Sequence, residues 1–215
     1  MNTPHFTIRH ELPSDFLAMN LLAREAFWNL YGPGCEEHLA LHQLRQHPDY
    51  LPELSWILLK DDQYIGGIYF SRSMVKHPDG TMTPTLTFGP FFVHPDVQRQ
   101  GYGRTLMEHA LQAVRQTQEI AIVILGFPYH YQPYGFVGGK HVGLSMEDGN
   151  FYAGLQVLPL KDSSLSLQGF PVFTEALSVD PSLIDAFDQQ FPVKEKKVLP
   201  HHEHLAFEMM KLDES

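Results

Sequence analysis

Two glycines stand close together just before mid-chain, in the stretch VHPDVQRQGYGRTLMEHAL. Gly101 and Gly103 follow a run of β-forming residues and precede apolar residues with helical spacing, so they occupy a turn from a strand into a helix. The first backbone N–H groups of a helix have no partner within it, and the positive end of the helix dipole lies beside them. Glycine lets a ligand approach such a backbone closely. The pattern predicts an anion-binding turn, with a purely structural turn as the alternative.

Two common nucleotide-binding motifs fit this turn poorly. A Walker loop continues from its last glycine with Lys and then Ser or Thr, whereas Gly103 is followed by Arg104 and Thr105. A dinucleotide fingerprint requires a third small residue, where this chain has Leu106. It also requires an acid at the end of the next strand, but EIAIVILG ends in glycine. A nucleotide-binding enzyme is therefore the weaker interpretation.

The residues before the turn indicate the shape of the ligand. In FGPFF, Gly89 weakens a strand and Pro90 has no N–H for a ladder, so we expect the strand to bulge there. A strand parted from its neighbour leaves backbone groups for an extended ligand, whose phosphates would then reach the glycine turn. A molecule with a diphosphate and an amide-bearing arm, such as coenzyme A, meets these requirements.

Other groups of reactive side chains predict less. His38 and His42 are spaced to share a helix face, and HHEH occupies positions 201–204. Neither has a third ligand at a diagnostic spacing, so we expect no metal site. Cys35 has no catalytic signature around it and is interpreted as a small packing residue. Because it is the only cysteine, an intrachain disulfide is excluded.

The elements that position the turn follow a mixed α/β pattern. Apolar periodicity and turn residues predict helices at 16–31, 36–46, 104–116 and 181–190, the first capped by Ser14 or Asp15. Strands are expected at 5–12, on both sides of a hairpin turn at Asp61–Asp62, at 85–93 with an interruption at Gly89–Pro90, at 119–126 and at 151–160.

Composition limits the class of protein. The chain has 215 residues, 43% of them hydrophobic, which is enough for one large domain with a real core. Its net charge of −10 disfavours nucleic-acid binding and is compatible with cationic ligands. The N-terminal stretch lacks the apolar core of a signal peptide, and no segment is long enough to cross a bilayer. We expect a cytoplasmic protein without a membrane or nucleic-acid partner.

Two motifs together resemble the GNAT superfamily of acetyl-CoA-dependent N-acetyltransferases, in a bacterial branch of unassigned substrate. VHPDVQRQGYGRTLMEHAL is similar to motif A, whose signature Gln/Arg-x-x-Gly-x-Gly/Ala is matched by Gln98, Gly101 and Gly103. HYQPYGF is similar to motif B, in which a tyrosine, here Tyr131, lies four residues before a Gly-Phe pair. The resemblance covers the chain from the first strand to about position 157. It divides the chain into a GNAT domain at 1–158 and a C-terminal extension at 159–215 packed on the same domain.

The resemblance implies a central mixed, mostly antiparallel sheet flanked by helices, with a splayed strand pair that binds acyl-CoA. Backbone groups of Phe91, Phe92 and Val93 would bond the pantetheine arm. The pyrophosphate would lie on the turn, for which we select the residues Gln98, Arg99, Gln100, Gly101, Tyr102, Gly103 and Arg104. Side chains on the two glycines would occupy the place of the phosphates. Acetyl-CoA is then a co-substrate, and no metal is required.

The implied reaction is direct attack of an amine on the thioester. The backbone N–H of Phe92 would bind the oxyanion. Tyr131 would protonate the departing thiolate, because a tyrosine with a pKa near 10 is protonated at neutral pH, and Tyr129 and Tyr134 compete for that role. Many relatives carry a glutamate on the strand before motif A, but TLTFGPFF has none. Glu53 is the first candidate for the base, and Glu25 is the second.

The acceptor stays open: a small-molecule amine, a protein N-terminus or a lysine. The acidic balance and the aromatic FWNLY segment favour a small cationic amine, because the first helices line the acceptor side in this family. A non-catalytic acyl-CoA-binding sensor or interaction module is the alternative from another class, favoured by the missing strand glutamate. Residues 159–215 would either close the acceptor side or form a homodimer contact.

Overall fold

The computed structural model describes residues 5–161 and 166–213. Residues 1–4, 162–165 and 214–215 lie outside the described residues; they fall within the two predicted domain ranges and include no predicted site residue. The chain forms two compact units, each assembled from separated stretches. Unit 1 comprises 1–70, 89–114 and 175–199, and unit 2 comprises 71–88, 115–174 and 200–215. The predicted division after residue 158 stays a prediction.

Unit 1 contains the N-terminal strands and four helices. Its strands follow the order β1-β2-β3-β4, and both the β1–β2 and the β2–β3 pairs are antiparallel. The strands are β1 Phe6–Arg9, β2 Trp56–Lys60, the first part of β3 Gln63–Lys76 and the last part of β4 Met82–Val93. The helices are α1 Phe16–Phe27, α2 Glu37–Leu44, α3 Tyr102–Val114 and α5 Pro181–Asp188.

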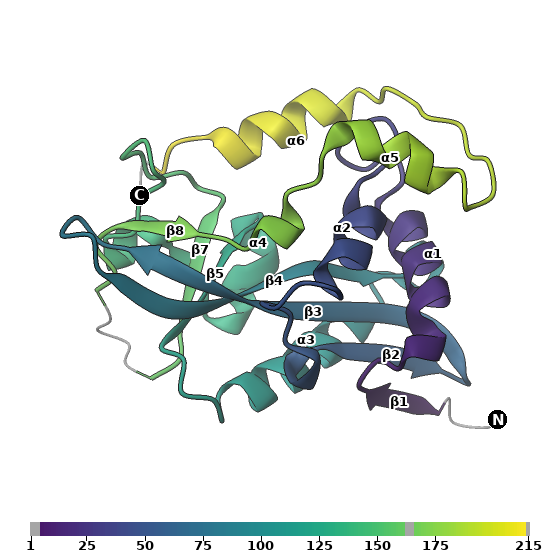
Figure 1. Ribbon diagram of the computed structural model, residues 1–215, viewed down its shortest axis with the longest axis horizontal. Helices are drawn as coiled ribbons and strands as arrows, with labels where there is room; N and C mark the ends of the chain where they lie inside the picture. The colour runs from purple at the N-terminus through teal and green to yellow at the C-terminus, as the bar shows by residue number, and fades with distance from the viewer. Residues whose placement is uncertain (1–4, 162–165, 214–215) are drawn as a thin grey trace. The chain divides into compact units, whose positions relative to one another are not determined.

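Two adjacent glycines of β3 show how the helices of unit 1 cover opposite faces of its strands. A Cβ on Gly66 would lie 3.5 Å from Leu106 of α3, whereas a Cβ on Gly67 would lie 2.9 Å from Met19 of α1. Side chains alternate between the two faces of a strand, so α1 lies on one face and α3 on the other (Figure 1). Helix α2 packs beside α1, and its Leu41 and Leu44 are fully buried.

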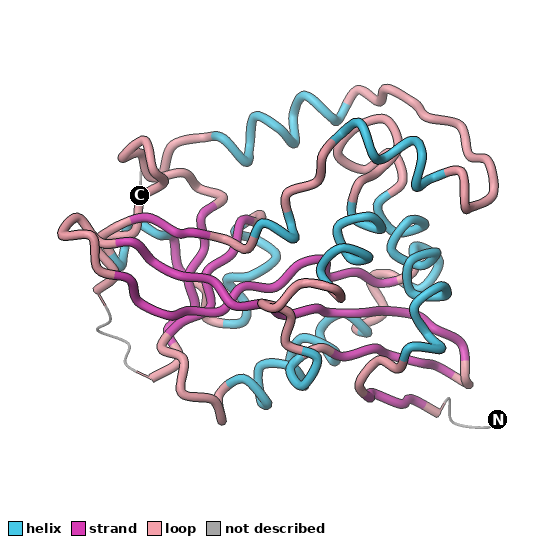
Figure 2. Tube along the Cα trace, in the orientation of Figure 1, coloured by secondary structure: helices cyan, strands magenta, loops and turns pink. Residues whose placement is uncertain are grey.

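Unit 2 contains the rest of the sheet. Its strands follow the order β3-β4-β5-β7-β6, with β8 on the free side of β3. They include β5 Ala121–Leu125, β6 Val137–Gly138, β7 Leu155–Pro159 and β8 Phe170–Val172. The helices are α4 Pro128–Tyr131 and α6 His201–Met210. Strands β5 and β7 run side by side as an antiparallel pair, visible in magenta in Figure 2, and β4 pairs with β5 in parallel. The predicted mixed, mostly antiparallel sheet flanked by helices is therefore confirmed.

Most predicted elements are present, with specific differences. The hairpin turn is confirmed, because Asp61 and Asp62 both adopt the left-handed conformation that such a turn requires. The glycine-turn helix begins at Tyr102 rather than at 104. β4 continues as one strand through Gly89–Pro90, so the predicted interruption is absent, whereas the bulge expected there stays a prediction. Helix α6 was not expected, since four of its first five residues are His or Glu. No helix in the described part of the chain is long and apolar enough to span a membrane.

Asp15 stands at the predicted N-cap position of the first helix, α1, but its carboxylate makes no cap hydrogen bond to that helix. Instead it accepts hydrogen bonds from Arg9 (2.6 Å), from Tyr64 (2.7 Å) and from the N–H of Leu12 (2.7 Å). The bond from Arg9 is the main reason that the pKa of Asp15 lies below its usual range. The Asp15 carboxylate therefore joins β1 to β3, and its bond from Leu12 belongs to the 3₁₀ turn Pro13–Asp15 that precedes α1.

Candidate functional site

The glycine turn is a short loop in unit 1 between β4 and α3. The strand ends at Val93, and His94 follows it, with its ring Nδ1 accepting a hydrogen bond from the N–H of Asp96 at 3.2 Å. A turn of 3₁₀-helix spans Pro95–Val97. His94 therefore shapes the turn, which is a structural role. The amide side chains also hold the loop: Gln98 Nε2 donates to the carbonyl of Val93 at 3.1 Å.

The backbone of the protein itself requires glycine at position 101 but not at position 103. Gly101 has a φ of +91°, a left-handed conformation that costs other residues about 1–2 kcal/mol, and a Cβ there would meet no protein atom within 4 Å. Gly103 has no positive φ. A Cβ on Gly103 would lie 3.4 Å from Val93 and 3.6 Å from Phe91, both ordinary contacts. The backbone conformation therefore explains Gly101, whereas packing in the protein itself leaves room for a methyl group at position 103.

The turn presents a run of free backbone donors. Within the described chain, none of the six N–H groups from Arg99 to Arg104 has a protein acceptor, and the first helical bond is that of Thr105 N–H to the carbonyl of Gly101, at 3.0 Å. The first turn of α3 contains no acidic residue. Arg99 and Arg104 are exposed, and Arg99 has a φ of +60°. Unpaired donors, a helix dipole and two cations make this surface favourable for a phosphate.

The strand that leads into the turn is anchored in the core. Phe92 is 4% exposed, and its ring packs against Phe27 of α1 and against Tyr69 of β3, with both centroid distances at 6.1 Å. Its neighbours Phe91 and Val93 are half-buried. The end of β4 is therefore fixed by aromatic packing, so the following turn has a defined position.

Tyr131 lies in unit 2, at the end of α4. Its half-buried ring packs between Phe88 and Phe136, at centroid distances of 5.7 and 5.6 Å. A Cβ on Gly126 would lie only 2.3 Å from the Cε2 atom of this ring, so only glycine fits beneath it. Sequence reasoning selected Tyr131 but missed Gly126, whose signal is a glycine directly after a buried strand and five residues before the tyrosine. The competing Tyr129 is 63% exposed.

The two candidate bases are both in unit 1. Glu53 lies on a turn of 3₁₀-helix at Pro52–Leu54, and its side chain is exposed. Glu25 on α1 forms an ion pair with Lys194 at 2.6 Å. This pairing occupies the carboxylate of Glu25. Of the two, Glu53 is the more available to a ligand.

Cys35 and the histidines have structural surroundings. The Cys35 sulfur lies 3.4 Å from His38 Nδ1. Burial raises the pKa of the thiol to about 12, so it is protonated and unreactive at neutral pH. His38 is fully buried, and burial lowers its pKa to about 4. Among the residues that the structure describes, no group of three His, Cys, Asp or Glu side chains is arranged to hold a metal ion.

The fold and the turn define a class: a mixed sheet in which a strand, a glycine turn and a helix present unpaired amides to an anion. Residues 22–128 match the model of the acetyltransferase (GNAT) family. The chain therefore belongs to the GNAT family of acetyltransferases. No curated protein matches its sequence.

Solved structures resemble this chain over most of their length. A GNAT family N-acetyltransferase (YhbS) from Escherichia coli, determined in complex with CoA, is 25% identical with a TM-score of 0.72, covering 83% of this chain and 95% of its own. A GNAT family acetyltransferase from Brucella melitensis, in complex with acetyl-CoA, is 24% identical with a TM-score of 0.64, over 80% and 97% of the two chains. The ribosomal-protein-S18-alanine N-acetyltransferase from Escherichia coli shares the fold at 20% identity and a TM-score of 0.52, over 74% and 96%.

Proposed function

We propose that this chain transfers an acetyl group from acetyl-CoA to a primary amine of a small molecule or a protein, by direct attack in a ternary complex. The observation that carries the proposal is the run of six unpaired N–H groups from Arg99 to Arg104, which begins a helix in a chain of the GNAT family. The CoA and acetyl-CoA bound in the Escherichia coli and Brucella melitensis structures support the choice of co-substrate.

The coenzyme would bind through backbone groups. Phe91, Phe92 and Val93 would bond the pantetheine arm, and the turn residues Gln98, Arg99, Gln100, Gly101, Tyr102, Gly103 and Arg104 would hold the pyrophosphate. The vacant space at Gly101 and the room at Gly103 support this arrangement. The exposed Arg99 and Arg104 would add charge, and hydrogen bonds to charged groups contribute about 1.5–3 kcal/mol each.

The chemistry would need an oxyanion donor and an acid. The backbone N–H of Phe92 would stabilise the negative charge that develops on the thioester oxygen. Tyr131 would give its proton to the thiolate that leaves when the carbon–sulfur bond breaks. Support for Tyr131 over its two neighbours comes from its packed ring and from the glycine beneath it.

Removal of a proton from the amine is the third task. An alkylamine with a pKa of about 10.4 is neutral in only about one molecule in a few thousand at pH 7. Glu53 would accept the proton, directly or through water. Its exposure leaves it accessible, whereas Glu25 is paired with Lys194.

One observation favours a second candidate function. β4, which spans Met82–Val93, contains no acidic residue, so the glutamate that many relatives carry on this strand is missing. A chain that kept the turn but lost a base would be a non-catalytic acyl-CoA-binding sensor or interaction module.

Turnover separates the two functions. The protein is incubated with acetyl-CoA and a panel of primary amines, including an alkyl diamine, an arylalkylamine and a lysine peptide, and free CoA thiol is measured. Amine-dependent thiol release supports the transferase. Acetyl-CoA binding by calorimetry, with no release above the rate of the boiled protein for any amine class, would support the sensor instead.

A further inference from the structure

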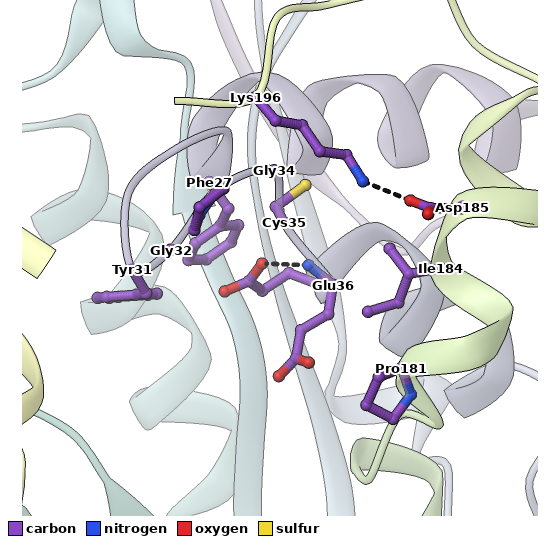
Figure 3. A pocket seen from close by; sticks show the side chains of 12 residues that line it. Phe27, Tyr31, Gly32, Gly34, Cys35, Glu36, Pro181, Ile184, Asp185 and Lys196 are labelled. Carbon is purple, nitrogen blue, oxygen red and sulfur yellow. Dashed lines mark hydrogen bonds and ion pairs between the residues drawn. The ribbon is translucent and has the colours of Figure 1, made fainter. Parts of the chain in front are cut away.

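A pocket of about 400 Å³ lies within unit 1, away from the glycine turn in sequence. Its walls come from the end of α1, the loop that joins α1 to α2, and α5 together with the segment that follows it. Figure 3 shows side chains from these segments around one space, with Tyr31 and Glu36 on the α1–α2 side and Ile184 and Asp185 on α5.

The charged groups of the pocket are mainly acidic. Three carboxyl groups line it, those of Glu36, Glu37 and Asp185, against one ammonium group, that of Lys196. Lys196 is already committed, because it forms an ion pair with Asp185 (Figure 3). The carboxylates of Glu36 and Glu37 therefore give the pocket an excess of negative charge.

Glu37 is the half-buried member of this set. Its Oε2 atom accepts a hydrogen bond from the N–H of Glu36 at 3.1 Å, and none of the described Lys, Arg or His side chains pairs with it. Burial raises its pKa to about 7, and the charge of Glu36 adds to this effect. The charged and titratable groups that share the pocket with it are Tyr31, Cys35, Glu36, Asp185 and Lys196. A ligand cation would supply the partner that the protein does not.

The remaining walls are aromatic and apolar. Phe27 and Tyr31 stand 6.1 Å apart between ring centroids, and Ile184 lies on the opposite side, on α5. Aromatic faces attract ammonium groups, and apolar walls accept a hydrocarbon body. Phe27 also packs against Phe92 of β4, so the pocket and the end of the strand share a wall.

Hydrogen bonds hold the pocket walls in place without a ligand. Asn29 has a φ of +56°. Its side-chain Oδ1 accepts hydrogen bonds from the N–H of Gly34 at 2.8 Å and from the N–H of Lys197 at 3.0 Å. Its Nδ2 donates to the carbonyl of Glu195 at 3.0 Å. Gly34 leaves room for the Lys196 stem, since its Cβ would lie 3.2 Å from Lys196 Cε. The α1–α2 loop and the segment after α5 are thus joined at one residue.

We propose that this pocket binds an organic ammonium group on an apolar body, with the Glu37 carboxylate as its ionic partner and Phe27 and Tyr31 as its aromatic walls. As an assignment of the amine acceptor, the inference rests on the proposed transferase function. As a binding site for organic cations, it stands on the pocket alone.

The test uses benzyltrimethylammonium, whose charge does not titrate and whose nitrogen cannot be acetylated. Calorimetric titration of the full chain is expected to show binding that strengthens about tenfold between about pH 6 and about pH 8, because the ionised fraction of a group with a pKa of about 7 rises by that factor. Benzyl alcohol, which is uncharged, is expected to bind at least about tenfold more weakly at the higher pH.

Two variants assign the effect to one carboxylate. Glu37→Gln is expected to bind weakly and without the pH dependence. Glu36→Gln, which removes the same charge from the exposed neighbour, is expected to keep both the binding and its pH dependence.

Three results would overturn the proposal: no binding by the wild-type chain, binding independent of pH, or pH-dependent binding retained by Glu37→Gln. Circular dichroism of each variant confirms that it is folded. Acetyl-CoA titrated into the same samples separates this outcome from that of the proposed function. Cation binding without acetyl-CoA binding would contradict the proposed transferase function and support the proposed cation site. Acetyl-CoA binding without cation binding would contradict only the proposed cation site.

Discussion

The packing of Tyr131 over Gly126 gives a sharp prediction for a single methyl group. In Gly126→Ala the new Cβ would lie 2.3 Å from Tyr131 Cε2, a distance that real Cβ atoms essentially never show, and 3.0 Å from its Cδ2, which is tighter than most real contacts. The ring cannot simply rotate away, because Phe88 and Phe136 pack against it. Gly126 is also held in place, since its N–H donates to the carbonyl of Gly154 at 2.8 Å.

The expected cost is that of overpacking. Ordinary contact requires the ring to move by about 1 Å, and extra atoms in a packed region cost about 1–3 kcal/mol. In a chain of this size each kcal/mol lowers the melting temperature by about 2–4 °C. If Tyr131 is the acid, a displacement of about 1 Å is also expected to lower turnover by about 10- to 100-fold, with acetyl-CoA affinity unchanged.

Thermal and urea unfolding of Gly126→Ala, Tyr131→Ala and the double variant test this reasoning. The double variant removes the ring, so the alanine should then cost almost nothing or stabilise the chain by about 0.4–1 kcal/mol. Equal costs of the alanine with and without the ring would refute the assignment of Gly126 as the residue that makes room for Tyr131.

Three further substitutions test the proposed acid, the proposed base and a buried ion pair of unit 1. Tyr131→Phe should lower turnover with little change in acetyl-CoA affinity, and wild-type turnover in a steady-state assay would remove the acid role. Glu53→Gln should shift the pH–rate profile to higher pH, whereas a profile that superimposes on that of the wild type would exclude Glu53 as the base. Asp188→Asn should destabilise unit 1 by about 3–5 kcal/mol in urea unfolding, because it leaves the 1%-exposed Arg24 without its ionic partner; a loss below about 1 kcal/mol would contradict the pairing.

Local patterns in the sequence were sufficient to predict the hairpin turn, the glycine turn and the helix that follows the glycine turn. Asp61, Asp62 and Gly101 all adopt the left-handed backbone conformation. Aspartate and glycine are residue types that tolerate this conformation, so the sequence indicates a turn at each place. Apolar spacing located α3 to within two residues. These features depend on neighbours in the chain, so periodicity and turn chemistry can predict them.

Contacts between distant residues could not be predicted in this way. Arg24 of α1 pairs with Asp188 of α5, 164 positions later, at 2.6 Å, and nothing near either residue indicates the other. The role of Gly126 depends on where a ring on another element lies. Glu37 was passed over because its chain neighbours are polar, and only the fold shows that it is half-buried beside a pocket. Burial of a polar group is a tertiary property.

The central claim is that the unpaired amides of residues 99–104 hold the diphosphate of acetyl-CoA. Calorimetry of acetyl-CoA with the wild-type chain and with Gly103→Leu tests it most directly. Protein atoms leave room for a Cβ at position 103, whereas a leucine side chain there would occupy the space that a bound phosphate needs. We expect binding by the wild type and a loss of about 100-fold or more in the variant, because blocking two hydrogen bonds to a charged group costs at least about 3 kcal/mol. Equal affinity of the two folded proteins, or no heat with the wild type, would contradict the claim.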